Sequence, residues 1–278
     1  MTRFIVAPQW QGSPSTRAMQ LVDGAAAIAE DLPRSVTTIL EAPHEAGDAL
    51  GGTVRRLSAL QQMRERLDNA LADTGTDPVL VVGGDCGVSV AAAAHAAARA
   101  ATTGERLAVV WADAHPDLHS PDSSTSHAFS GMSLRAILGE GPESLRLPPG
   151  TVAPTDLVLV GARAIDDAEA EFIALHGIRT IAADALSDPH ALADAVRATA
   201  ATAVFVHVDV DVLDPDEMPG VKSPEPFGVR LADLVGALKE LRAEVPVVAS
   251  AITEFLPASR DAASADLGTI LRIVGALA

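Results

Sequence analysis

The sequence predicts an α/β fold in which helices cover both faces of a mostly parallel sheet of eight strands. Short β-branched runs alternate with longer Ala-, Leu- and Arg-rich segments of helical spacing. Several runs, such as PVLVVGG, RLAVVWAD and TAVFVHVDV, are apolar almost throughout, as strands covered on both faces are. No linker, repeat or low-complexity tract divides the chain, so we expect a single domain over residues 1–278.

The strands are expected near 3–8, 36–40, 78–83, 107–112, 155–161, 178–182, 203–211 and 246–253. The helices are expected near 15–30, 54–73, 88–103, 131–139, 167–176, 188–201, 230–243 and 264–276. Pro189, just after Asp188, and Leu231, after a Pro/Gly-rich approach, are typical of helix starts. The Ala-rich stretch 91–101 is interpreted as a tightly packed helix.

Composition argues against several classes of function. The net charge of −17 argues against nonspecific nucleic-acid binding through a basic surface and favours cationic ligands. The single cysteine allows no intrachain disulfide and suits a reducing compartment. No apolar run reaches the roughly 18–20 residues of a membrane span, and MTRFIVAPQW lacks the apolar core of a signal peptide. We therefore expect a cytoplasmic protein without a membrane or nucleic-acid partner.

Polar clusters follow the expected strands at their carboxyl ends, where open parallel sheets bind ligands. They are Gly83-Gly84-Asp85-Cys86, then Asp113, His115, Asp117 and His119, then Asp166, Asp209, Asp211 and Glu254. Their strands are parallel, so these side chains should share one edge of the sheet.

Two of these clusters predict a metal site. WADAHPDLH places Asp113, His115 and Asp117 at alternating positions, and HVDVDVLDP does the same for Asp209 and Asp211. Four carboxylates at one sheet edge repel one another unless cations compensate them, and two divalent ions supply +4 against −4. Carboxylates with a single imidazole favour a hard or borderline ion such as Mn²⁺. His207 is expected to have a structural or supporting role, because the two Asp already satisfy the site.

The motifs GGDCG, DAHPD, DVDVLDPDEMPG and TEF, in this order from about residue 79 to 256, resemble the signature of the arginase (ureohydrolase) family. The resemblance implies an arginase-like three-layer α/β/α fold and a binuclear manganese centre whose bridging hydroxide attacks guanidino or related C–N bonds. It also implies a small-molecule substrate, and family members are often homo-oligomers.

Carried over by position, the resemblance assigns metal ligands and catalytic groups. Asp113 and Asp209 would bridge the two metals. Asp117 and Cys86 would complete one metal, and His115 and Asp211 the other. Asp117 would also accept a hydrogen bond from the hydroxide and later pass the proton to the leaving amine. Glu254 would pair with the guanidinium and orient its carbon.

The far end of the substrate would be held by two segments. In DLHSPDSSTSHAFSGM, His119 replaces the usual Asn of the family, and Ser126 matches the Ser that contacts the α-carboxylate. In GARAIDDAE, Asp166 and Glu169 fall where family members receive the α-ammonium group; Asp166 is also a natural helix N-cap. These residues favour an amino-acid substrate over agmatine.

Two departures touch the catalytic machinery. Cys86 stands where the family has His, and because thiolate matches Mn²⁺ poorly, the adjacent metal is expected to bind weakly or to be lost. The alternative is a small buried Cys86 that merely fills space, in a site that effectively carries one metal. Ser130 stands where arginases have a proton-shuttle His, and His127 either reaches the same space or is an exposed loop residue.

The Cys-for-His change resembles family members that hydrolyse Nω-hydroxy-L-arginine to hydroxyurea and L-ornithine in biosynthesis of the antibiotic D-cycloserine. That reaction is the main prediction. The alternatives are an ordinary arginase, a relative acting on agmatine or a formimino compound, and a metal-binding pseudoenzyme.

Overall fold

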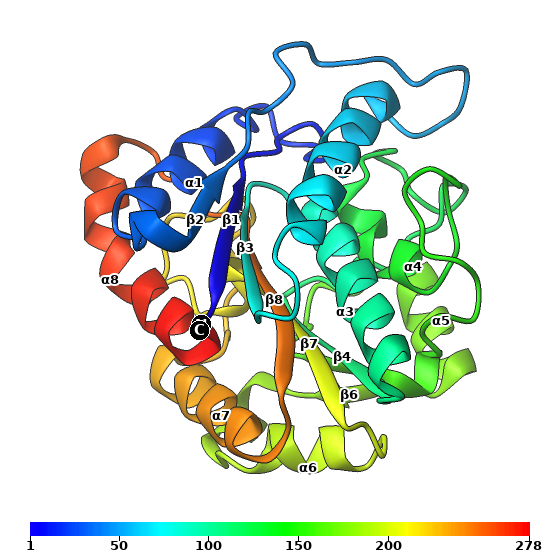
Figure 1. Cartoon of the computed structure of the whole chain (residues 1–278), viewed down its shortest axis with the longest axis vertical. Coiled ribbons are helices and arrows are strands. Elements are labelled where there is room, and N and C mark those ends of the chain that lie inside the picture. The colour runs from blue at the N-terminus through cyan, green and yellow to red at the C-terminus, as the bar shows by residue number, and fades with distance from the viewer.

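The computed structural model describes residues 1–278 and contains one eight-stranded sheet in which every neighbouring pair is parallel. The strand order is β2-β1-β3-β8-β7-β4-β5-β6 (Figure 1). The strands are β1 Arg3–Ala7, β2 Thr37–Ile39, β3 Val79–Gly83, β4 Leu107–Ala112, β5 Leu157–Val160, β6 Arg179–Ile181, β7 Ala203–Asp209 and β8 Val247–Thr253. The predicted α/β fold with an eight-stranded parallel sheet is therefore confirmed.

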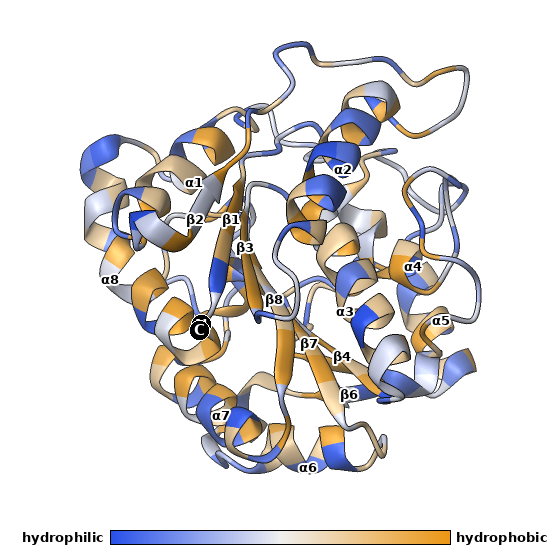
Figure 2. Ribbon diagram, viewed as in Figure 1, coloured by the Kyte–Doolittle hydropathy of each residue, from blue (hydrophilic) through white to orange (hydrophobic).

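Helices cover both faces of the sheet (Figure 1). One face packs against α1 Gln20–Glu30, α6 Ala191–Arg197, α7 Leu231–Glu244 and α8 Arg260–Leu277. The other packs against α2 Leu57–Ala72, α3 Ser89–Thr103, α4 Ser133–Ile137 and α5 Asp167–His176. The apolar strands lie between helices that are polar on their outer sides (Figure 2).

Alternation along each strand divides the core in two. In β4, Val110 faces one cluster of 39 buried residues, and Val109 and Trp111 face a second cluster of 39. The central strands are buried on both faces, which explains why their sequences are continuously apolar rather than alternating. This packing fixes the strand ends that carry the polar clusters.

Element boundaries differ from the expected ones by a few residues. The last helix begins at Arg260 rather than near 264, because the side chain of Ser259 caps it by accepting a hydrogen bond from the backbone N–H of Ala262. The sixth helix begins at Ala191, after a 3-10 segment over Ala183–Ser187.

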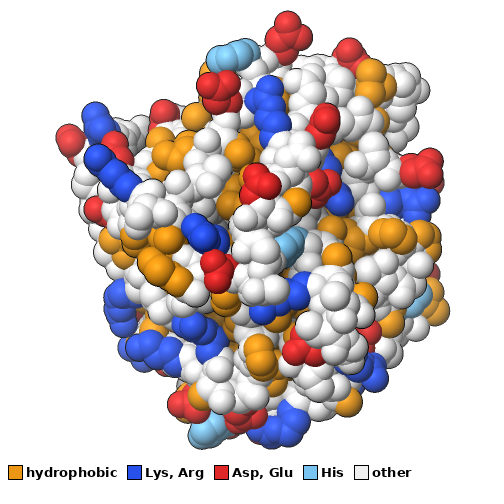
Figure 3. Space-filling model, in the orientation of Figure 1, with side chains coloured by type: hydrophobic (Ala, Val, Ile, Leu, Met, Phe, Trp, Pro, Cys, Tyr) orange, Lys and Arg blue, Asp and Glu red, His pale blue; other side chains and the backbone are white.

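The surface carries charged side chains of both signs. Acidic and basic side chains are interspersed on the face that Figure 3 shows. No helix combines the length and the apolar character that crossing a membrane requires.

Candidate metal centre

The four central strands bring the predicted ligands together. β3, β8, β7 and β4 are adjacent in the sheet. Cys86 follows β3, Asp113 follows β4, Asp209 ends β7 and Glu254 follows β8. Parallel strands end at the same edge, so the chain delivers these groups to one place.

Two overlapping groups of side chains have ligand atoms within 4.8 Å of one another. The first contains Cys86, Asp113, His207 and Asp209, and the second contains Asp113, His115 and Asp211. Asp113 belongs to both. In the first group the Cys86 thiol donates to Asp209, with an Sγ–Oδ2 distance of 3.2 Å. In the second, His115 Nδ1 lies 3.1 Å from Asp211 Oδ2.

Each of these aspartates is oriented by a backbone N–H. His115 N donates to Asp113 Oδ1 at 2.7 Å, Asp211 N donates to Asp209 Oδ1 at 2.8 Å, and Ala114 N donates to Asp211 Oδ1 at 3.1 Å. The backbone therefore holds one oxygen of each carboxylate and turns the other toward the cluster. Such support is typical of metal ligands, whose orientation determines affinity.

Asp85 holds the turn that presents Cys86. Its buried carboxylate accepts from Gln9 Nε2 at 2.7 Å, Gly12 N at 2.8 Å and Gly87 N at 2.9 Å. Burial raises the pKa of Asp85 to about 6, and these donors oppose that rise. Only glycine fits at position 84, immediately before Asp85, because a Cβ there would lie 1.8 Å from the carbonyl oxygen of Gln9.

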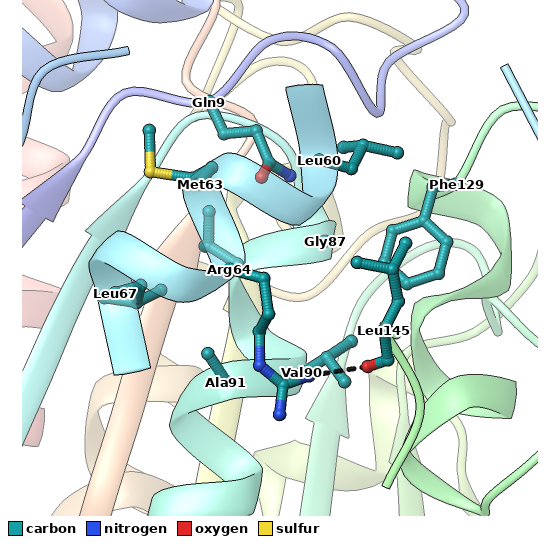
Figure 4. Close-up of a pocket in the computed structure, with 11 residues that line it drawn as sticks. Gln9, Leu60, Met63, Arg64, Leu67, Gly87, Val90, Ala91, Phe129 and Leu145 are labelled. Carbon is teal, nitrogen blue, oxygen red and sulfur yellow. Dashed lines mark hydrogen bonds between the residues drawn. The ribbon is translucent and has the colours of Figure 1, made fainter. Parts of the chain in front are cut away.

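Behind this turn lies a small apolar void lined by Gln9, Gly87 and side chains of α2 (Figure 4). Its volume of about 10 Å³ holds at most a single water molecule, so it is no substrate pocket. Arg64 donates from Nη1 to the carbonyl of Leu145 at 2.6 Å and closes one side of the void. The turn that carries Cys86 thus rests on a nearly solid layer.

His207 lies closer to the ligands than the sequence indicated. Its ring is fully buried and stacks on Trp111 with centroids 3.6 Å apart. Nδ1 is 2.8 Å from the hydroxyl of Ser89, whereas Nε2 has no hydrogen-bond partner and lies 3.7 Å from Asp113 Oδ2. Burial lowers the pKa of His207, which favours neutral imidazole, the form that binds metals.

Asp117 and Glu254 share two unusual features. Both adopt a left-handed backbone conformation, with φ of +52° and +63°, which non-glycine residues rarely adopt. Both are buried, and Asp117 Oδ2 and Glu254 Oε2 have no hydrogen-bond partner. Strain and unpaired buried oxygens together indicate a functional constraint.

Negative charge is concentrated in the cluster. Burial and neighbouring carboxylates raise the pKa values of Asp117 and Asp209 well above their usual range. Burial also raises the pKa of Glu254 to about 7, although Lys222 partly opposes this. Burial acts to lower the pKa of His115, but its bonds to Asp113 and Asp211 outweigh that and raise it to about 12. The edge therefore attracts protons or other cations.

Lys222 is the one basic residue whose charged group lies against Glu254. Its Nζ lies 3.8 Å from Glu254 Oε1, and its side chain is 18% exposed. Lys222 was not among the predicted site residues, although it is one of only two lysines in the chain and lies two residues after the motif DVDVLDPDEMPG.

Three of the residues predicted to hold the far end of the substrate, His119, Asp166 and Glu169, lie in contact. His119 Nε2 lies 3.0 Å from Asp166 Oδ2 and 4.0 Å from Glu169 Oε1. Asp166 caps α5 by accepting from Glu169 N at 3.0 Å, and Glu169 in turn accepts from Leu118 N at 3.1 Å. Half of the Asp166 side chain remains exposed.

The other loop residues lie apart from this contact. Ser126 accepts from Ala128 N at 3.2 Å, and Ser130 is buried at the start of a 3-10 turn. His127 is exposed, with φ of +53°, and its ring makes no hydrogen bond.

Arg163 stabilises the loop that follows β7 through hydrogen bonds to its backbone. Its guanidinium donates to six backbone carbonyls, including those of Asp211 at 2.9 Å and Glu225 at 2.8 Å. Arg163 was quoted within GARAIDDAE without a role of its own. Its position three residues after the buried strand β5 was the available signal.

Comparisons with known proteins agree with this geometry. The sequence model described as "Arginase family" matches residues 17–274. An arginase of Bacillus caldovelox is 32% identical over 219 residues, which cover 75% of this chain and 70% of that protein. Its native structure superimposes with a TM-score of 0.80 at 25% identity, covering 99% of this chain and 97% of that one. The Entamoeba histolytica arginase in complex with L-ornithine gives a TM-score of 0.86 at 21% identity, covering 99% and 97%.

Proposed function

The chain belongs to the arginase family, and on that premise we propose that it is a manganese-dependent amidinohydrolase that converts Nω-hydroxy-L-arginine to hydroxyurea and L-ornithine. The observation that carries this proposal is the pair of ligand clusters sharing Asp113 at one edge of the sheet, next to the unpaired oxygens of Asp117 and Glu254.

The residues present fit two divalent cations. Asp113, Asp209 and Cys86 would hold one ion, together with Asp117, the ligand that the family resemblance assigns, and with His207 beside them. Asp113, His115 and Asp211 would hold the other ion. The buried, partnerless atoms His207 Nε2 and Asp117 Oδ2 are the kind of group that a cation satisfies. Oxygen ligands with imidazole suit Mn²⁺, whereas the thiol does not, so we expect the ion beside Cys86 to bind more weakly. A free thiol in this role suits the reducing cytoplasm.

When bound, such ions act as Lewis acids and lower the pKa of water toward about 7. Asp117, whose Oδ2 has no protein partner, is placed to accept a proton and return it to the leaving amine. Glu254 offers Oε2 to the N–H groups of the substrate and orients its reacting carbon. The half-exposed Asp166, with His119 and Glu169 behind it, would hold the α-ammonium group, and Ser126 the α-carboxylate.

Two features favour the hydroxylated substrate over arginine. Cys86 replaces the family's imidazole ligand, and Ser130, a residue that does not titrate, stands where arginases place a proton shuttle. Neither feature disturbs the residues proposed to hold the amino-acid end. This pattern supports a guanidine of altered charge rather than a lost activity, and we propose that the protein acts in antibiotic biosynthesis. Ordinary arginase is the second candidate, since the relatives described above are named arginases.

The test is release of L-ornithine from Nω-hydroxy-L-arginine by Mn²⁺-loaded protein, with metal content measured on the same sample. Chelator-treated protein is the control and should be inactive until Mn²⁺ is restored. If fully loaded protein binds the substrate and releases no ornithine, the enzyme proposal fails in favour of a pseudoenzyme.

A further inference from the structure

The ammonium group of Lys222 lies beside the carboxylate that would receive the substrate's guanidine. Nζ is 3.8 Å from Oε1 of Glu254, a side chain that is only 1% exposed. The other oxygen, Oε2, has no partner. Glu254 thus has one oxygen facing a protein cation and one oxygen free.

Backbone contacts on both sides of Lys222 fix its position in the loop. Its neighbour Val221 forms an antiparallel bridge with Phe255, and Leu256 N donates to the carbonyl of Gly220 at 2.8 Å. Further along the loop, Arg163 binds the carbonyl of Glu225. The segment carrying Lys222 is therefore tied to the residues that directly follow Glu254.

The ammonium group of Lys222 determines which kind of guanidine can bind at Glu254. An ammonium group and a guanidinium group both donate hydrogen bonds and accept none, so they repel each other and form no mutual hydrogen bond. An N-hydroxyguanidine has a much lower pKa than a guanidinium, so it enters with less positive charge. It also carries an oxygen that accepts from an ammonium group.

We propose that Lys222 is a specificity-determining residue that disfavours guanidinium substrates and favours neutral, oxygen-bearing guanidines at Glu254. This inference rests on the proposed function and deepens it. It assigns the discrimination against arginine to a specific charge, independently of Cys86 and Ser130.

The test compares Lys222→Met and Lys222→Gln, which remove the charge, with Lys222→Arg, which keeps it. Lys239→Met, at an exposed position of α7, is the matched control. Each Mn²⁺-loaded protein receives equal concentrations of arginine and Nω-hydroxy-L-arginine, and urea and hydroxyurea are quantified. Removing a unit charge about 5 Å from a cationic substrate, at an effective dielectric constant near 20, should raise the urea-to-hydroxyurea ratio by roughly 250-fold. Lys222→Arg and Lys239→Met should retain the wild-type ratio.

Binding of the isolated guanidinium ion and of hydroxyguanidine, read as a shift in melting temperature, separates this inference from the proposed function. If the wild type fails to hydrolyse the hydroxylated substrate, the proposed function is wrong, but tighter guanidinium binding in Lys222→Met still supports the role of Lys222. If both neutral variants fold and keep the wild-type product ratio and guanidinium affinity, Lys222 is merely the ion partner of Glu254 and the inference is overturned.

Discussion

Replacing Ser89 by Ala tests whether His207 is a metal ligand. The Ser89 hydroxyl lies 2.8 Å from Nδ1 of His207, and both side chains are fully buried. The substitution keeps Cβ and leaves no sizeable cavity, so the loss is mainly that of one hydrogen bond. An unsatisfied buried nitrogen costs about 1–3 kcal/mol, and the better helix propensity of Ala returns roughly 0.5 kcal/mol. We expect a net loss of about 0.5–2.5 kcal/mol in the free energy of unfolding.

The same substitution should also lower the affinity for Mn²⁺. In the tautomer of His207 in which Nδ1–H donates to Ser89, the lone pair lies on Nε2, the atom near Asp113 and Asp209. Removing a group that orients a metal-binding His typically costs about 10–100-fold in affinity. Calorimetric titration of chelator-treated protein with Mn²⁺ measures this directly.

Ser133→Ala is the matched control, because that buried hydroxyl donates only to the backbone carbonyl of Phe129, at 3.2 Å. It should cost stability without weakening Mn²⁺ binding. If Ser89→Ala also loses stability while its Mn²⁺ affinity stays within twofold of wild type, His207 supports the fold and binds no metal.

The remaining predictions concern the same edge of the sheet. The free energy of unfolding of metal-free protein should fall as pH rises from about 6.5 to 8.5 in urea titrations. His115, with its pKa raised to about 12, loses its stabilising effect above its unfolded value, and Glu254, with its pKa raised to about 7, holds a proton that the unfolded chain has released. Mn²⁺ should reverse or flatten this slope, and an unchanged slope would contradict the charge model. Asp209→Ala should abolish Mn²⁺ binding and turnover, as shown by metal analysis and ornithine release; unchanged turnover would exclude the metal model. Cys86→His should tighten the weaker Mn²⁺ site about tenfold or more and raise turnover of arginine, whereas unchanged metal content and substrate preference would place Cys86 outside the site.

The sheet could be predicted from the sequence because its strands are buried on both faces. Leu107–Ala112 is apolar at every position, so its pattern fits neither an amphipathic helix nor a half-exposed strand and predicts a buried strand. Helix ends were less certain. The start of α8 at Arg260 depends on the cap at Ser259, and several nearby small polar residues could have capped a helix equally well.

The convergence of the proposed carboxylate ligands could be predicted, because alternation after a strand places Asp113 and His115, or Asp209 and Asp211, on one side. The proposed role of His207 was not evident, since only the fold shows that Ser89 contacts one nitrogen and that the other has no partner. Lys222 was missed for a similar reason. Its distance from Glu254 depends on a 32-residue separation closed by the packing of a loop without regular periodicity.

The most direct test of the proposed reaction is a competition in one vessel. Mn²⁺-loaded protein is given equal concentrations of Nω-hydroxy-L-arginine and L-arginine, and hydroxyurea and urea are quantified at early times. The product ratio equals the ratio of the two kcat/KM values, because each product arises from one substrate only. We predict hydroxyurea in large excess. Urea in excess would identify the protein as an ordinary arginase in which Cys86 and Ser130 are tolerated changes.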